Sequence, residues 1–173
     1  NIFIMGDSAG GGLSLALLQM IKKQKLQKAA GTVLLSPWTD LTLSGDSVHS
    51  KKDVDPLIQP HLLEIFSKRY YGNEDPANPL ISPLFADVKG FPPTLIQVGG
   101  NEILLDDSTR IAQKLNKAGV RVKLDIFENM MHVWQFFGGI MPEANRAIEE
   151  IGEFVKSIKV STKADKLDTM AVY

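Results

Sequence analysis

A serine in a glycine-framed motif near the start of the chain has the setting needed for nucleophilic chemistry. Residues 6–10 match G-x-S-x-G, directly after a short apolar run and directly before a helical pattern. There a sharp strand-to-helix turn exposes the hydroxyl of Ser8, and small residues at positions 6 and 10 let the backbone turn without clashes. The Ala9 amide, in the first helical turn, would point at a developing oxyanion. The alternative is a glycine-rich turn without chemistry, because the motif also occurs by chance.

A serine nucleophile needs a base, and the chain has three histidines. His49 lies in a polar stretch and His61 near the start of a short helix, so both are most simply surface residues. His132 follows the last predicted strand by a few residues, which places it at the same sheet edge as Ser8. We interpret His132 as the general base, the alternative being a histidine with no catalytic role. All three histidines follow Ser8, which fits the order serine, acid, histidine and neither the trypsin-like nor the subtilisin-like order.

The hydrophobic pattern indicates which elements position these groups. Short apolar runs predict strands, and residues at helical spacing predict the helices between them. The predicted strands are 2–5, 32–35, 94–98 and 120–127, and the predicted helices are 9–28, 60–71, 108–118 and 142–158. This order predicts an α/β domain with a mainly parallel sheet and flanking helices. Residues 38–93 interrupt the alternation, and irregular insertions of such length usually carry function.

Composition excludes several classes of function. The chain has 173 residues and a formal net charge of −1, so charge gives no case for a nucleic-acid partner or an anionic membrane. No apolar stretch reaches the roughly 18 residues of a spanning helix. The absence of cysteine excludes disulfides, a thiol nucleophile and thiolate metal sites, and we expect an intracellular, cytoplasmic protein. Leu15 stands where a dinucleotide loop needs its third glycine, so we expect no cofactor.

Five segments in register resemble the hormone-sensitive-lipase family of α/β-hydrolases, and most closely its bacterial carboxylesterases and lactone hydrolases. They cover nearly the whole chain and are residues 6–11, residues 34–41, residues 82–84, residues 92–99 and residues 128–132. The resemblance implies the α/β-hydrolase fold and hydrolysis of a small ester or lactone without a cofactor. It also implies that Ser8 is the nucleophile and His132 the general base.

The acid of the expected triad departs from the family pattern. The family places an aspartate just after the third strand, where this sequence has Asn101. An amide brings no charge to stabilise the imidazolium, and in trypsin-type enzymes the same change lowers turnover about 10⁴-fold. We therefore predict that Asn101→Asp raises turnover, unless Glu102 or Asp106 already serves as the acid. Asp106 and Asp107 more simply cap the following helix, and without a histidine beside these three acidic residues we expect no metal.

The family also carries a His-Gly-Gly-Gly oxyanion loop upstream of the nucleophile, and only five residues precede Gly6. We interpret residues 1–160 as the C-terminal part of an α/β-hydrolase domain and 161–173 as a frayed tail. Residues 41–72 are a cap-like or pocket insertion, and with Trp38, Phe136 and Phe137 they are candidates to line the substrate pocket, ordinary packing being the alternative. A catalytically impaired remnant, or a binding module of the same fold, is the second hypothesis for function.

Overall fold

A four-stranded parallel sheet forms the centre of the computed structural model, which describes residues 2–158. The strands are β1 (Phe3–Asp7), β2 (Gly31–Leu35), β3 (Thr94–Gly99) and β4 (Val122–Phe127), hydrogen-bonded in the order β1-β2-β3-β4. Every neighbouring pair is parallel, so the carboxyl ends of all four strands meet at one edge. β2 and β3 are buried along almost their whole length because both of their faces are covered.

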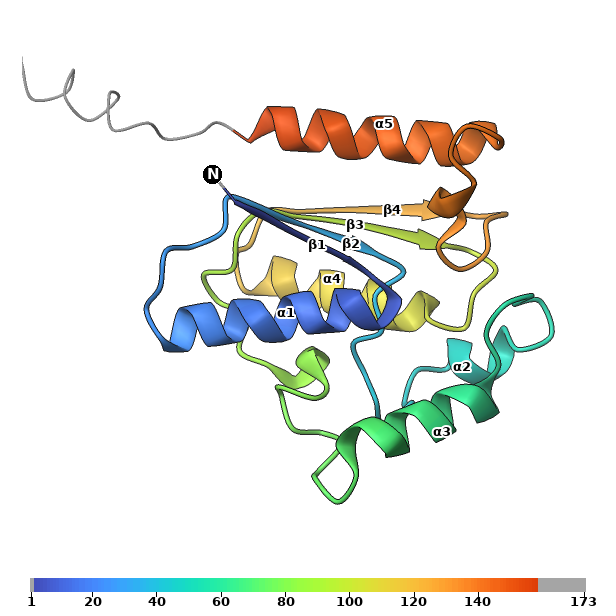
Figure 1. Ribbon diagram of the computed structural model, residues 1–173, viewed down its shortest axis with the longest axis horizontal. Helices are drawn as coiled ribbons and strands as arrows, with labels where there is room; N and C mark the ends of the chain where they lie inside the picture. The colour runs from blue at the N-terminus through green and yellow to red at the C-terminus, as the bar shows by residue number, and fades with distance from the viewer. Residues whose placement is uncertain (1, 159–173) are drawn as a thin grey trace, which may run out of the picture.

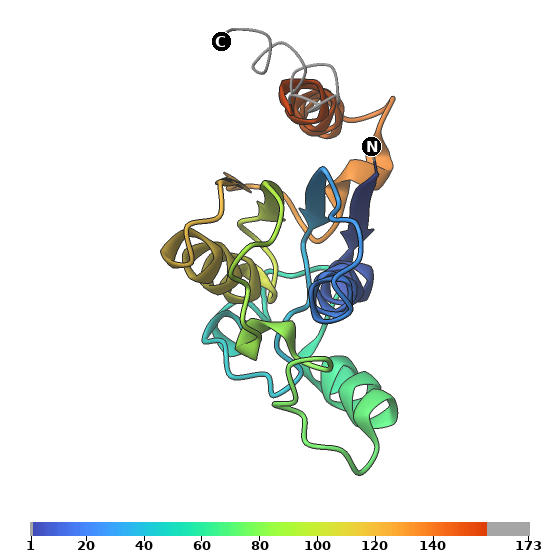
Figure 2. The ribbon, with the colours of Figure 1, turned by 90° about the vertical axis from the view of Figure 1, so that its left-hand side faces the viewer.

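Helices cover the two faces of the sheet as separate layers. Helices α1 (Ser8–Lys23) and α4 (Leu105–Lys117) lie on one face and α5 (Pro142–Ser157) on the other (Figure 1), and Figure 2 shows the same layers from the side. Leu15 of α1 and Ile111 of α4 pack against Ile96 of β3 in the larger core. On the opposite face, Leu95 packs against Phe154 of α5. Because successive side chains of a strand point to opposite faces, the sheet contributes to two separate apolar cores.

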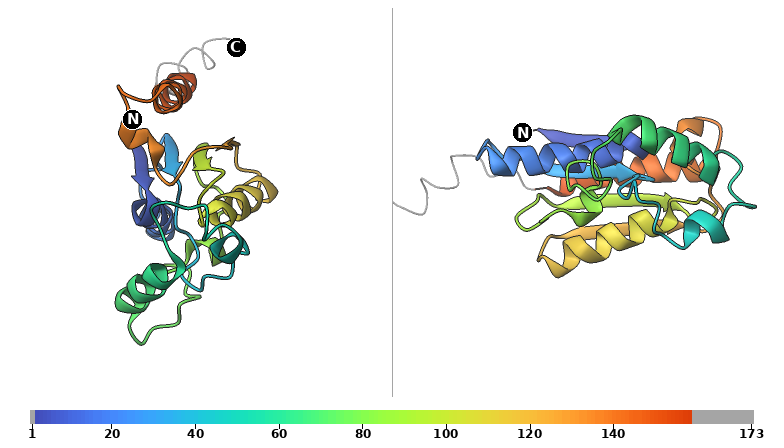
Figure 3. Two further views of the ribbon diagram at one scale, coloured as in Figure 1. Left: turned by 90° about the vertical axis from the view of Figure 1, so that its right-hand side faces the viewer. Right: turned by 90° about the horizontal axis from the view of Figure 1, so that it is seen from below.

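The long connection between β2 and β3 forms a further layer outside α1 and α4 (Figures 1 and 3). It contains α2 (Ser47–Ser50), α3 (Pro60–Tyr71) and a short 3₁₀ turn, η1 (Pro83–Phe85). A third apolar cluster joins this layer to the segment after β3; its buried members are Trp38, Leu41, Leu63, Ile103 and Leu104. A second 3₁₀ turn, η2 (Trp134–Phe137), follows β4 and leads to α5. The insertion therefore packs beside the carboxyl edge of the sheet.

The structure confirms the four predicted strands and the four predicted helices in their order, corrects several ends and adds one short helix. Helix α3 spans 60–71 as predicted, with Pro60 in its first turn and Gly72 at its end. Helix α1 stops at Lys23 rather than continuing to residue 28, because Lys25 adopts a left-handed φ of 54°. Helix α4 begins three residues earlier than predicted, at Leu105. The stretch 38–60, expected to be a loop, contains the single helical turn α2.

β1 lies at an edge of the sheet in the part of the chain that is described. Met5 on β1 is half-exposed, and Leu13 and Leu17 on α1 also present apolar side chains to solvent. The predicted tail, 161–173, lies outside the described residues. None of the helices within 2–158 combines the length and hydropathy needed to cross a bilayer.

Candidate active site

Ser8 stands at a sharp turn between the first strand and the first helix. β1 ends at Asp7 and α1 begins at Ser8, whose φ of 50° lies in the left-handed region. Such a conformation costs a non-glycine residue about 1–2 kcal/mol, and it turns the side chain out of the strand-to-helix junction. The turn needs glycine at position 6, because a Cβ there would lie 2.2 Å from the Gly10 carbonyl oxygen. At Gly10 a Cβ would meet nothing within 4 Å, so the structure does not show the steric need for a small residue that the motif predicts at this position.

Glu102 and His132 form a buried pair at the same edge of the sheet. Glu102 Oε1 lies 3.1 Å from His132 Nδ1, and both side chains are almost completely excluded from solvent. Glu102 Oε2 accepts hydrogen bonds from the Gly99 amide at 2.8 Å and from Ser36 Oγ at 2.7 Å. Because an ionised carboxylate only accepts, Nδ1 of a neutral imidazole must carry the proton. Nε2 is then the ring nitrogen free to accept a proton.

The residue at the expected acid position, Asn101, makes no hydrogen bond to the base in the described part of the chain. Its backbone amide donates to the Met130 carbonyl at 3.0 Å, and none of the hydrogen bonds found within 2–158 joins its side chain to His132. The next residue, Glu102, takes that place, because the Gly99-Gly100 turn presents residue 102 rather than residue 101 to the imidazole. Those hydrogen bonds also include none between Ser8 Oγ and His132, so the pairing of nucleophile and base stays a proposal.

Asp106 and Asp107 lie in the first turn of α4 but do not cap it. Asp106 Oδ2 instead accepts a hydrogen bond from the Ser47 amide at 2.9 Å, which joins α4 to the insertion. Its carboxylate is therefore bonded to the insertion and not to His132. Asp107 Oδ2 accepts from the amides of Thr39 and Asp40, at 2.6 and 2.8 Å. Since these carboxylates and that of Glu102 have separate partners, they do not converge on a cation. Over 2–158, no three acidic or histidine side chains are arranged as metal ligands.

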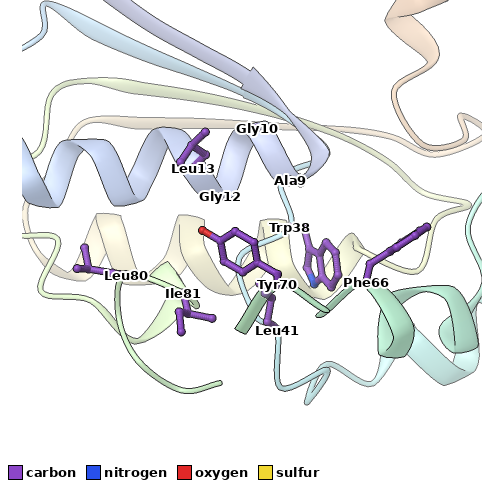
Figure 4. Close-up of a pocket in the computed structure, with 10 residues that line it drawn as sticks. All are labelled: Ala9, Gly10, Gly12, Leu13, Trp38, Leu41, Phe66, Tyr70, Leu80 and Ile81. Atoms are coloured by element: carbon purple, nitrogen blue, oxygen red, sulfur yellow. The ribbon is translucent and has the colours of Figure 1, made fainter. Parts of the chain in front are cut away.

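A pocket of about 320 Å³ opens beside the nucleophile turn (Figure 4). Its residues come from α1, from the segment after β2, from α3 and from the stretch before η1; they are Ala9, Gly10, Gly12, Leu13, Trp38, Leu41, Phe66, Tyr70, Leu80 and Ile81. Trp38 and part of 41–72 line this pocket, and their role in binding substrate stays a prediction. Phe136 and Phe137 do not: they lie exposed on η2. Leu13, Leu80 and Ile81 were missed, because an apolar residue on a helix or loop looks the same whether it faces a core or a pocket.

Two buried carboxylates support the segment that carries Trp38. Burial raises the pKa of Asp107 to about 7, helped by the nearby Asp40 charge and opposed by the amide hydrogen bonds from Thr39 and Asp40. Burial also acts to raise the pKa of Asp40, but hydrogen bonds from Ser44, Thr42 and Arg110 together lower it below 3.8. Arg110 Nη1 lies 3.0 Å from Asp40 Oδ2. The negative charge of this pair therefore sits on Asp40 first, and Asp107 ionises later as the pH rises.

Asp107→Asn is expected to flatten the dependence of stability on pH. The pKa of Asp107 is about 7 in the folded state and 3.8 in the unfolded chain. At a pH between these values the carboxyl group therefore takes up a proton when the chain folds. The free energy of unfolding should therefore fall as the pH rises through this window, by up to about 1.4 kcal/mol per pH unit. The asparagine carbonyl can still accept from Thr39 and Asp40. Urea unfolding at pH 4 to 8 tests this, with the exposed Asp53→Asn as control; equal slopes for Asp107→Asn and wild type would contradict it.

Comparison with known proteins shows which family this chain belongs to. Residues 1–136 match the model of a family with the alpha/beta hydrolase fold. The chain is 40% identical over 159 residues to an esterase of Acinetobacter venetianus, and 38% identical over 157 residues to an acetyl-hydrolase of Streptomyces hygroscopicus; each alignment covers 91% of this chain and 52% of the relative. The fold and the match together define the class: this chain belongs to the α/β-hydrolase family.

Solved structures narrow the relationship. An esterase from the bacterial hormone-sensitive lipase family superposes with a TM-score of 0.89 at 41% identity, covering 91% of this chain and 53% of that one. The hormone-sensitive-lipase homologue EstE7 from a metagenome library superposes with a TM-score of 0.88 at 46% identity, covering 90% and 54%. The chain is thus a hormone-sensitive-lipase-like α/β-hydrolase, as its motifs predicted. It spans about half the length of the curated relatives it matches.

Proposed function

We propose that this protein is a carboxylic-ester hydrolase that acts on small esters or lactones through an acyl-enzyme on Ser8. The observation that carries the proposal is the convergence at one sheet edge of a strained serine turn and a buried carboxylate–imidazole pair. The relatives named as an esterase and an acetyl-hydrolase support the same reaction class. The apolar pocket beside Ala9 is suited to an aliphatic substituent of the ester.

In the proposed reaction, Ser8 Oγ attacks the carbonyl carbon while His132 Nε2 takes the hydroxyl proton. The Glu102 carboxylate stabilises the imidazolium through Nδ1, and the Ala9 amide donates to the developing oxyanion. The imidazolium then gives its proton to the alcohol oxygen, the ester bond breaks, and the acyl group stays on Ser8. Water, deprotonated by His132, attacks the acyl carbonyl in the same way and releases the carboxylic acid. No step needs a redox group or a metal.

The alternative of a catalytically impaired remnant has two reasons, an amide at the acid position and the lack of the family's oxyanion loop within residues 1–173. The contact between Glu102 and His132 supplies a carboxylate and bears on the first reason alone. Turnover of a short-chain nitrophenyl ester by the full-length protein, compared with its Ser8→Ala variant, separates the two functions. Equal rates for both proteins would favour the remnant.

A fluorophosphonate is expected to label Ser8 and no other serine of the full-length protein. The reagent phosphonylates only a serine whose proton is removed by a neighbouring base, so exposed serines without one should not react. Mass spectrometry of the peptide that spans residues 6–10 identifies the site. Ser8→Ala and His132→Ala should both abolish labelling. A wild-type protein left unmodified at Ser8 would overturn the nucleophile assignment.

A further inference from the structure

Ser36 connects the acid and the base through a single hydroxyl group. This residue directly follows β2 and is completely buried. Its Oγ donates to Glu102 Oε2 at 2.7 Å and accepts from the backbone amide of Val133 at 3.2 Å. Val133 is the neighbour of His132, so one side chain links the carboxylate to the loop that carries the imidazole. The same hydroxyl both donates and accepts, which a serine or threonine can do and an alanine cannot.

The backbone at Ser36 is strained in the same sense as at Ser8. Its φ of 46° lies in the left-handed region, and its amide donates to the Gln97 carbonyl at 2.7 Å. Glycine adopts this conformation without cost, whereas a serine there loses stability. Non-glycine residues persist in such conformations where the surrounding structure holds them, and they concentrate at functional sites. Here the side chain that is held in this way points at the carboxylate of Glu102.

The two oxygens of Glu102 have different tasks because of this contact. Oε2 accepts from both Ser36 Oγ and the Gly99 amide, whereas Oε1 faces His132 Nδ1. Two donors on Oε2 fix the plane of the carboxylate and compensate the burial of its charge. With Ser36 removed, one donor would remain and the carboxylate could rotate about its last bond.

We propose that Ser36 is a positioning residue for catalysis, whose hydroxyl holds Glu102 Oε1 toward His132 Nδ1 and fixes the loop that bears His132. The proposal rests on the proposed function, since it assigns Ser36 a role in the same reaction. None of the hydrogen bonds found within 2–158 joins Ser36 to Ser8, so in this proposal Ser36 acts through Glu102 and the backbone of Val133.

Ser36→Ala in the full-length protein is expected to lower kcat about 10- to 100-fold with little change in KM, the rate equivalent of one hydrogen bond to a charged group. Rates are expressed per active site titrated with fluorophosphonate, so that loss of folded protein does not count. The NMR resonance of the His132 Nδ1 proton, which reports its contact with Glu102, should move upfield or broaden. Ser108→Ala is the matched control: Ser108 is equally buried, its Oγ has no hydrogen-bond partner within 2–158, and kcat should not change.

Ser36→Gly separates the hydroxyl from the backbone conformation. Glycine relieves the positive φ but lacks the hydroxyl, so this variant should fold at least as well as Ser36→Ala and lose the same activity. It also carries the test if Ser36→Ala does not fold. Unchanged kcat per titrated site in either variant, or an unmoved Nδ1 proton resonance, would overturn the proposal. Failure of the wild type to label at Ser8 is a different result, which would overturn the proposed function itself.

Discussion

Glu102→Gln is expected to lower kcat about 10⁴-fold while the protein stays folded. The amide is nearly the same size as the carboxylate, but its two ends are no longer equivalent. Ser36 Oγ and the Gly99 amide both donate to Oε2, so the carbonyl oxygen of glutamine must occupy that place. The NH₂ group then takes the position of Oε1 and donates to His132 Nδ1. This forces the proton onto Nε2, and the imidazole can no longer accept a proton from Ser8.

Asn101→Asp serves as the paired measurement for this prediction. None of the hydrogen bonds found within 2–158 joins the Asn101 side chain to His132, whose Nδ1 faces Glu102 instead, so a carboxylate at position 101 should leave kcat within a few-fold of wild type. This expected result replaces the gain in turnover that is predicted when position 101 is taken as the acid. Steady-state kinetics of both variants on a nitrophenyl ester decide between the two residues. A large gain for Asn101→Asp, or a Glu102→Gln variant within tenfold of wild type, would return the acid to position 101.

Gly100→Ala is expected to reduce both stability and activity. A Cβ at position 100 would lie 2.2 Å from the carbonyl oxygen of Glu128, a backbone atom that cannot rotate away. Separating the two loops should lower the free energy of unfolding by about 1–3 kcal/mol. It should also move Glu102 away from His132, and a displacement of about 1 Å in such a pair lowers kcat about 100-fold. Urea unfolding and kcat per titrated active site measure the two effects.

Gly152→Ala is the matched control for this substitution. Gly152 lies within α5, and a Cβ there would meet nothing within 4 Å. The same change should therefore raise the free energy of unfolding by about 0.5–1 kcal/mol, since alanine favours helix over glycine, and should leave kcat unchanged. Gly100→Ala with wild-type stability and kcat would show that the two loops can separate without consequence.

Local pattern was sufficient to predict the elements and two of the proposed catalytic residues. Ser8 follows a strand in a motif whose turn depends on the residues beside it, and His132 follows the last strand of the sheet. The choice between Asn101 and Glu102 depends instead on how the Gly99-Gly100 turn is held. That turn packs against the backbone of residues 128–131, about 30 positions later in the chain. No feature of residues 99–102 taken alone shows which side chain meets the imidazole.

The end of α1 and part of the pocket lining differ from the sequence-based prediction for related reasons. Nothing in the lysine-rich stretch 22–28 marks Lys25 as the residue that turns into the left-handed region, because lysine ordinarily favours helix. Aromatic residues close in sequence to the base are typical of a pocket lining, yet Phe136 and Phe137 lie exposed on η2. The residues that line the pocket belong largely to the insertion, whose path over the sheet depends on contacts made by Asp55 and Asp107 with distant backbone amides.

The hydrogen bonds of the Ser36 hydroxyl also have a consequence for how the chain folds. The hydroxyl bonds to Glu102 and to Val133, which lie 66 and 97 positions further along the chain. Closing loops of this length costs chain entropy, and non-local contacts of this kind in parallel sheets slow folding. We therefore expect the hydrogen bonds of Ser36 to Glu102 and Val133, which complete the site, to be among the last contacts to form. During refolding, recovery of hydrolysis should lag behind recovery of helix content, and enzymatic activity becomes a reporter of the final step of folding.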